Sequence, residues 1–209
     1  MTVIKAIRHA EIPLNKEIMR RYIAGRSASQ EITEHGREEA EQMGSCYLSQ
    51  NYKPEFARVS PAIRARQTGE IILSICAPEI ELITTDRLHE ISLGAYEGKD
   101  RNEVYTDEVV AEIQKKLLDF KLPGTESMRE VAERGIEEVL KLGRLYPDQT
   151  GFIFTHYMTI STMVGQILGL SHSQIRNADI GNCSETELVV IDGKIKVSHV
   201  GRSLIDLAA

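Results

Sequence analysis

The stretch Val3-Ile4-Lys5-Ala6-Ile7-Arg8-His9-Ala10-Glu11 changes from an apolar, β-branched run into a polar cluster that carries both charge signs. The run is typical of a buried strand, and the polar cluster after it is typical of a loop that carries functional side chains. Later stretches show the same character and are also expected to be strands: 56–59, 80–84 and 151–154. Each of them is followed by polar or charged residues, so the pattern predicts several strands whose ends carry chemistry.

Segments with apolar or small residues at helical spacing lie between these strands. They cover about 33–49, 61–75, 125–145 and 158–170, with Thr33, Ser60-Pro61 and Thr125 or Ser127 as candidate helix starts. Alternating strands and helices predict an α/β fold: a three-layer sandwich with a mainly parallel sheet and helices on both faces. Two late strands joined by Asp192-Gly193 are expected to form an antiparallel pair.

Length and composition favour one globular domain. The chain has 209 residues, of which 42% are hydrophobic and 27% charged, and both values are near the averages for soluble proteins. We expect a single domain over 1–209, with a small helical insertion at about 99–122, where charged residues dominate. Apolar runs are much shorter than the roughly 18 residues that span a bilayer, so no membrane partner is expected.

Charge and cysteine content limit the partners and the compartment. The net charge is −6, which argues against nucleic acid as a partner. The three cysteines, Cys46, Cys76 and Cys183, are far apart and odd in number, which favours reduced thiols in the cytoplasm. The partner expected is therefore a small molecule, and an exposed edge strand would also allow a homodimer.

Four groups of chemistry-bearing residues follow the expected strands. Arg8-His9 follow the first, Ser60 to Arg66 the second, Glu90 the third and His156 the fourth. Because ligands bind beyond the carboxyl ends of parallel strands, we expect these groups to converge. One arginine guanidinium can bind two phosphate oxygens at once. The positive charge of nearby arginines lowers the pKa of a histidine, so the imidazole stays neutral and nucleophilic. A carboxyl group that faces a phosphate can stay protonated and act as an acid.

Six motifs in this order resemble those of the histidine phosphatase superfamily, also called phosphoglycerate mutase-like. The similarity runs nearly end to end. The motifs are Arg8-His9-Ala10-Glu11 with Asn15, Ile32-Thr33-Glu34-His35-Gly36, Ser60-Pro61-Ala62-Ile63-Arg64-Ala65-Arg66-Gln67-Thr68, Leu88-His89-Glu90 with Gly94 and Tyr96-Glu97-Gly98, Pro123-Gly124-Thr125-Glu126-Ser127, and Thr155-His156 with Asn182-Cys183-Ser184.

The resemblance implies a role for each matching residue. His9 would be the nucleophile that becomes phosphohistidine, while Arg8, Arg64 and a protonated His156 would bind the phosphoryl oxygens. Glu90 would be the general acid and then the base, and Asn15 would contact the transferred group. The resemblance implies no metal and no cofactor, because the arginines and His156 would supply the positive charge.

The sequence departs from the family pattern at two positions, and it leaves three functions open. Ala10 replaces the family's usual glycine, and Tyr157 replaces the glycine that commonly follows the second histidine. Tyr157 could narrow the pocket and bind substrate, or pack as core. We expect a metal-independent phosphoric monoester hydrolase. The alternatives are a cofactor-dependent phosphoglycerate mutase and a non-catalytic phosphate-binding module, and the sequence does not identify the substrate.

Overall fold

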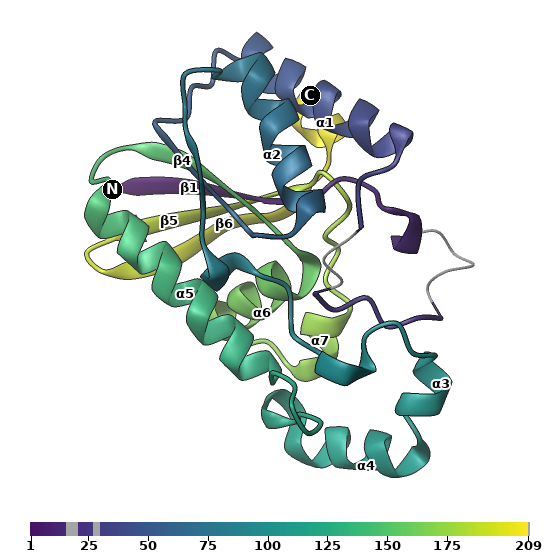
Figure 1. Ribbon diagram of the computed structural model, residues 1–209. Helices are drawn as coiled ribbons and strands as arrows, with labels where there is room; N and C mark the ends of the chain where they lie inside the picture. Colours follow the sequence, from purple (N-terminus) through teal and green to yellow (C-terminus); the bar gives the residue numbers. More distant parts are fainter. Residues whose placement is uncertain (16–20, 27–29, 209) are drawn as a thin grey trace.

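A six-stranded sheet forms the centre of the computed structural model, which describes residues 1–15, 21–26 and 30–208 (Figure 1). The strands are β1 (Thr2–Arg8), β2 (Phe56–Val59), β3 (Leu82–Thr84), β4 (Thr150–Thr155), β5 (Glu185–Ile191) and β6 (Lys194–Arg202). Across the sheet they follow the order β3-β2-β4-β1-β5-β6. The first four of these are parallel, while β5 is antiparallel to both β1 and β6. This confirms the mainly parallel sheet and its antiparallel C-terminal pair.

Helices cover both faces of the sheet, as predicted. They are α1 (Glu34–Ser49), α2 (Ile63–Cys76), α3 (Arg101–Val104), α4 (Asp107–Lys116), α5 (Met128–Leu145), α6 (Tyr157–Leu168), α7 (His172–Arg176) and α8 (Leu204–Ala208). In Figure 1, α1 and α2 lie above the sheet, and α5 and α6 lie below it. None of the helices in the described ranges is long and apolar enough to cross a membrane.

The central strand β4 shows why the sheet is buried on both faces. Phe152 and Phe154 belong to the core cluster that also holds Tyr47 of α1, whereas Ile153 belongs to the cluster that holds Leu142 of α5. All five side chains are fully buried. Successive strand residues point to opposite faces, so an unbroken apolar run is what a strand between two helical layers requires.

Two helix starts follow the predicted capping chemistry. Thr33 Oγ accepts the N–H of Gly36 at the start of α1. Ser127 and Glu130 form a reciprocal capping box at the start of α5. Both caps satisfy backbone N–H groups that have no partner within the helix.

The start of α2 differs from the prediction. The helix begins at Ile63, and Ala62 in the N-cap position makes no side-chain bond, so Ser60-Pro61 does not cap it. Ser60 Oγ accepts the N–H of Ala62, just before the helix, at 3.3 Å, and it also lies 2.7 Å from His156 Nε2. The side chain that was expected to cap α2 therefore contacts His156, the residue that directly follows β4.

Segment 99–122 contains several short helical pieces. These are α3, α4 and a 3-10 turn at Leu117–Asp119, and they lie at the lower end of the molecule in Figure 1. Leu117 has a φ of 51°, a conformation that ends α4 and prevents one continuous helix. The side chains of α4 are all at least partly exposed.

Candidate active site

The predicted site residues gather around one cavity of about 280 Å³, beyond the carboxyl ends of β1, β2 and β4. Six of the seven predicted residues line it, namely Arg8, His9, Asn15, Arg64, Glu90 and Tyr157. His156 is not among the residues that line the cavity; it is fully buried, and its ring contacts that of His9. The convergence expected from strand ends is therefore present, with one residue displaced from the cavity wall.

His9 lies directly after β1 and is held in a single tautomer. Its Nδ1 is 2.8 Å from the carbonyl oxygen of Ala10. A carbonyl can only accept, so Nδ1 carries the proton and the lone pair resides on Nε2. Burial, followed by the charges of Arg64 and Arg8, lowers the pKa of His9 well below 6.5. The imidazole is thus neutral near pH 7, which is the form that can attack phosphorus.

Two arginines on different elements approach His9. Arg8, the last residue of β1, donates from Nη1 to the carbonyl oxygen of Ile180 at 2.7 Å. Arg64, in the first turn of α2, donates from Nη2 to the carbonyl oxygen of Gly25 at 3.1 Å and is 3% exposed. Each guanidinium is therefore positioned by a backbone carbonyl. Together they form a positive wall that suits a phosphate dianion.

Asn15 is fixed by two hydrogen bonds to its side-chain oxygen. Oδ1 accepts the N–H of Ile12 at 3.0 Å and an N–H of Asn182 at 3.1 Å. Asn182 also donates to the carbonyl oxygen of His9. This arrangement ties the loop after β1 to the entrance of β5 and sets the orientation of the Asn15 amide at the cavity.

Glu90 supplies a buried carboxyl group to the same cavity. Its two oxygens accept the N–H groups of Ile91 at 2.9 Å and Met158 at 3.2 Å, the second at the start of α6. Burial raises the pKa of Glu90 above its ordinary value, although these N–H groups and Arg64 oppose the shift. The carboxyl is therefore more readily protonated than an exposed glutamate, as a general acid requires.

A charged cluster that sequence reasoning missed holds the main chain of Glu90. Arg26 and Arg134 both donate to the carbonyl oxygen of Glu90, and both pair with Glu126. Glu126 also accepts the N–H of Ser92. These residues connect three distant segments, so only the folded chain reveals their common target.

His156, directly after β4, packs against two other histidines. Its ring centroid is 5.3 Å from that of His9 and 6.2 Å from that of His89, which is nearly parallel to it. Burial and Arg64 lower the pKa of His156 well below 6.5, which favours the neutral imidazole, whereas the resemblance implied a protonated His156. Its Nδ1 has no hydrogen-bond partner among the described residues. The contact between His156 and phosphate stays a prediction.

His89, next to Glu90 in the chain, stacks on His156, and burial lowers its pKa to about 4. Glu97, from the same loop motif, accepts the backbone N–H groups of Arg26 and Leu93.

The sequence left open whether Tyr157 lines the pocket or packs as core, and the structure combines parts of both. Its ring lies against the Arg8 guanidinium, whose central carbon is 5.5 Å from the ring centroid. Its hydroxyl donates to the carbonyl oxygens of Arg176 and Ala178, away from His9. The ring forms part of the cavity wall, while the hydroxyl secures the chain after α7.

Within the described ranges, one group of side chains is close enough to hold a metal ion, namely Glu185, Glu187 and His199. None of them lines the cavity beside His9. The oxygens of Glu185 already contact Lys5, Tyr47 and His199, so this group is an internally paired network.

Comparison with known proteins places this geometry in a family. A curated relative, the probable phosphoglycerate mutase GpmB of Photorhabdus laumondii, is 30% identical over 191 residues, covering 88% of this chain and 83% of the relative. YhfR of Bacillus stearothermophilus shares the fold with a TM-score of 0.83 at 24% identity, covering 98% of this chain and all of that one.

A second solved structure, phosphoserine phosphatase from Entamoeba histolytica in complex with 3-phosphoglyceric acid, has a TM-score of 0.82 at 20% identity, and each chain is covered in full. The family model for branch 1 of the histidine phosphatases matches residues 4–202. That match spans every motif and every cavity residue described above, and the chain therefore belongs to the histidine phosphatase superfamily, branch 1.

Proposed function

We propose that this protein is a phosphomonoester hydrolase that works through a phosphohistidine on His9. The observation that carries the proposal is the state of His9: its Nδ1 proton is committed to the Ala10 carbonyl, which leaves the Nε2 lone pair beside Arg8 and Arg64. A fixed neutral imidazole in a positive, largely buried site is suited to nucleophilic attack on a phosphate dianion.

In the first step, Nε2 of His9 forms a bond to phosphorus, and the bond between phosphorus and the ester oxygen breaks. The protonated carboxyl of Glu90 gives its proton to the leaving oxygen, so the product is a neutral alcohol. Arg8 and Arg64 stabilise the negative charge on the remaining phosphoryl oxygens.

In the second step, water attacks phosphorus, and the Glu90 carboxylate accepts the proton that the water loses. The bond between His9 and phosphorus breaks, inorganic phosphate leaves, and both side chains return to their starting states. The raised pKa of Glu90 suits this exchange, because the group must lose and regain one proton in each cycle.

The proposal requires no metal ion, because the two arginines supply the positive charge at the transferred group. The test is release of inorganic phosphate from a panel of phosphomonoesters in the presence of a chelator. We expect chelator-resistant activity in the parent protein and none in His9→Ala. The matched control is His35→Ala, because the His35 side chain is 63% exposed and its ion pairs among the described residues are with its helix neighbours Glu38 and Glu39.

Two results would contradict the proposal. Turnover by His9→Ala near the parent rate would remove His9 from the mechanism. Phosphate binding by the parent without turnover of any ester would support the non-catalytic module instead.

A second candidate, phosphoglycerate mutase, is favoured by the name of the curated relative, whereas the phosphoserine phosphatase structure bears a phosphatase name. Both reactions use the same pocket and differ in whether the phosphoryl group is passed to water. Incubation with 3-phosphoglycerate and a bisphosphate primer separates them. Isomer exchange faster than phosphate release would identify the mutase, and phosphate release without exchange would identify the hydrolase.

A further inference from the structure

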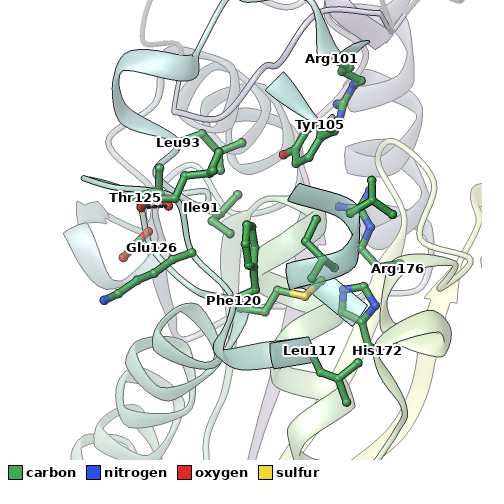
Figure 2. A pocket seen from close by; sticks show the side chains of 15 residues that line it. Ile91, Leu93, Arg101, Tyr105, Leu117, Phe120, Thr125, Glu126, His172 and Arg176 are labelled. Carbon is green, nitrogen blue, oxygen red and sulfur yellow. Dashed lines mark hydrogen bonds between the residues drawn. The ribbon is translucent and has the colours of Figure 1, made fainter. Parts of the chain in front are cut away.

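A second cavity, of about 330 Å³, lies between segment 99–122 and the body of the protein (Figure 2). Its volume is in the range of about 300–1,000 Å³ that small-molecule sites occupy. Most of the side chains that line it are apolar or aromatic, among them Ile91, Leu93, Ile113, Leu117, Phe120 and Met128. Figure 2 shows Phe120 near the centre of the view, between Ile91 and Leu117, with Arg101 and Arg176 to one side.

This apolar cavity adjoins the catalytic cavity. Five residues line both of them: Ile91, Leu93, Arg101, Tyr105 and Arg176. Ile91 directly follows Glu90, the proposed proton donor to the leaving oxygen. A substrate bound at His9 therefore has its leaving group on the side from which the second cavity is reached.

The apolar side chains of segment 99–122 are incompletely covered by the protein itself. Val110 of α4 is 39% exposed and Leu117 is 49% exposed, although both line the cavity. No residue of α4 is fully buried. When an apolar group displaces water from such exposed apolar surface, the free energy of the system falls, so binding of that group is favourable.

We propose that the second cavity binds the apolar part of the substrate, so that this enzyme prefers phosphomonoesters of medium-length alkyl or aryl alcohols over small polar phosphates. The inference rests on the proposed function of the first cavity and specifies its substrate class. The continuity of the two cavities at Ile91 and Tyr105 favours a substrate group over a protein or membrane partner.

The test uses a series of n-alkyl phosphates from methyl to octyl. Their leaving groups are chemically alike, so differences in kcat/KM report binding of the chain. Each buried methylene is expected to raise kcat/KM about fourfold, which corresponds to ~0.8 kcal/mol, until the cavity is filled. Glycerol phosphate and phosphoserine serve as polar substrates of similar size to the short alkyl esters, and we expect them to be poor.

Two neighbouring valines of α4 provide matched variants. Val110 lines the cavity, whereas Val109 does not and is partly buried elsewhere. Val110→Gln is expected to lower kcat/KM by a factor that grows with chain length and reaches about tenfold for octyl phosphate. Val109→Gln makes the same chemical change one residue away and is expected to keep the parent's dependence on chain length.

The outcomes separate this inference from the proposed function. Hydrolysis that does not depend on chain length, or an equal effect of both variants, would overturn the subsite while leaving the hydrolase intact. If no ester is hydrolysed, the hydrolase fails, and binding of n-alkyl phosphonates measured by calorimetry still decides the subsite. Affinity that rises with chain length in the parent and less steeply in Val110→Gln supports it, and affinity independent of chain length overturns it.

Discussion

Replacement of Ser60 by alanine removes the hydroxyl that lies 2.7 Å from His156 Nε2. Ser60 Oγ also accepts the N–H of Ala62, and among the described residues Nε2 is the one acceptor found for its own proton, so we assign that proton to the bond with Nε2. That hydrogen bond places the imidazole proton of His156 on Nδ1, the nitrogen without a partner among the described residues. We therefore expect Ser60 to set the tautomer in which His156 presents an N–H donor.

The expected loss of stability follows from the burial of Ser60 and His156, because both side chains are fully inaccessible to water. A buried polar atom that loses its partner destabilises the protein by about 1–3 kcal/mol. If His156 also contacts the transferred phosphoryl group, the same free energy in the transition state lowers kcat/KM roughly 5- to 150-fold.

The assay combines urea unfolding with kinetics on one alkyl phosphate. Ser161→Ala is the control, because Ser161 is also buried, and the one hydrogen bond found for its hydroxyl in the described part of the chain is a 3.4 Å bond to the Met158 carbonyl oxygen of its own helix. We expect a smaller loss of stability in the control and parent-like kcat/KM.

A double-mutant cycle decides the interpretation. In the His156→Ala background, Ser60→Ala should cost less than about 0.5 kcal/mol, because the two residues act as one unit. Parent-like stability of Ser60→Ala would refute the hydrogen bond. Lowered stability with unchanged kcat/KM would refute the catalytic part of the argument.

Three further substitutions test other parts of the site and the core. Arg64→Ala should cost on the order of 3 kcal/mol in kcat/KM, as loss of one oxyanion donor does, and an effect below about tenfold would place Arg64 outside the reaction. Glu90→Gln should impair alkyl phosphates far more than p-nitrophenyl phosphate, and it should abolish the decline of kcat/KM as the pH rises through the raised pKa of Glu90, where the acid form is lost; equal losses on both esters would argue against a proton donor. Glu138→Met should raise the free energy of unfolding by about 1 kcal/mol, because Glu138 is fully buried and neither oxygen has a hydrogen-bond partner among the described residues. If the free energy of unfolding, measured in urea, falls by a similar amount, the long ion pairs of Glu138 with Arg87 and Lys141 matter more than the desolvation of its carboxylate.

The parts of the site that could be predicted from the sequence are those next to strand ends. His9 and Arg64 stand beside apolar runs with clear boundaries, and parallel pairing brings such ends together whatever the details of packing. Glu90 was placed by the same reasoning through the loop after β3. Local pattern and topology suffice where the chemistry directly follows a strand.

The parts that could not be predicted depend on how distant elements dock. Arg134 lies in the middle of α5, where it resembles any charged residue on a helix surface, and only packing aims it at the Glu90 carbonyl. Ser60 has the pattern of a helix cap, but a neighbouring strand brings His156 within hydrogen-bond distance. The break at Leu117 has no glycine or proline to mark it, because a leucine there adopts a positive φ.

The position of β1 has a consequence for how this chain folds during synthesis. The strand that presents His9 is made before the other five strands of the sheet, yet its two neighbours are β4 and β5, so Val3 pairs with both Thr150 and Val189. Contacts so distant in sequence form slowly, because a long loop must close before they contribute stability. Until Glu185 and the residues after it leave the ribosome, one edge of β1 stays bare and able to pair with other chains. His9 therefore lies at the end of a strand that is not fully paired until β5 is in place, and before then the free edge of β1 is a place where another chain could add a strand.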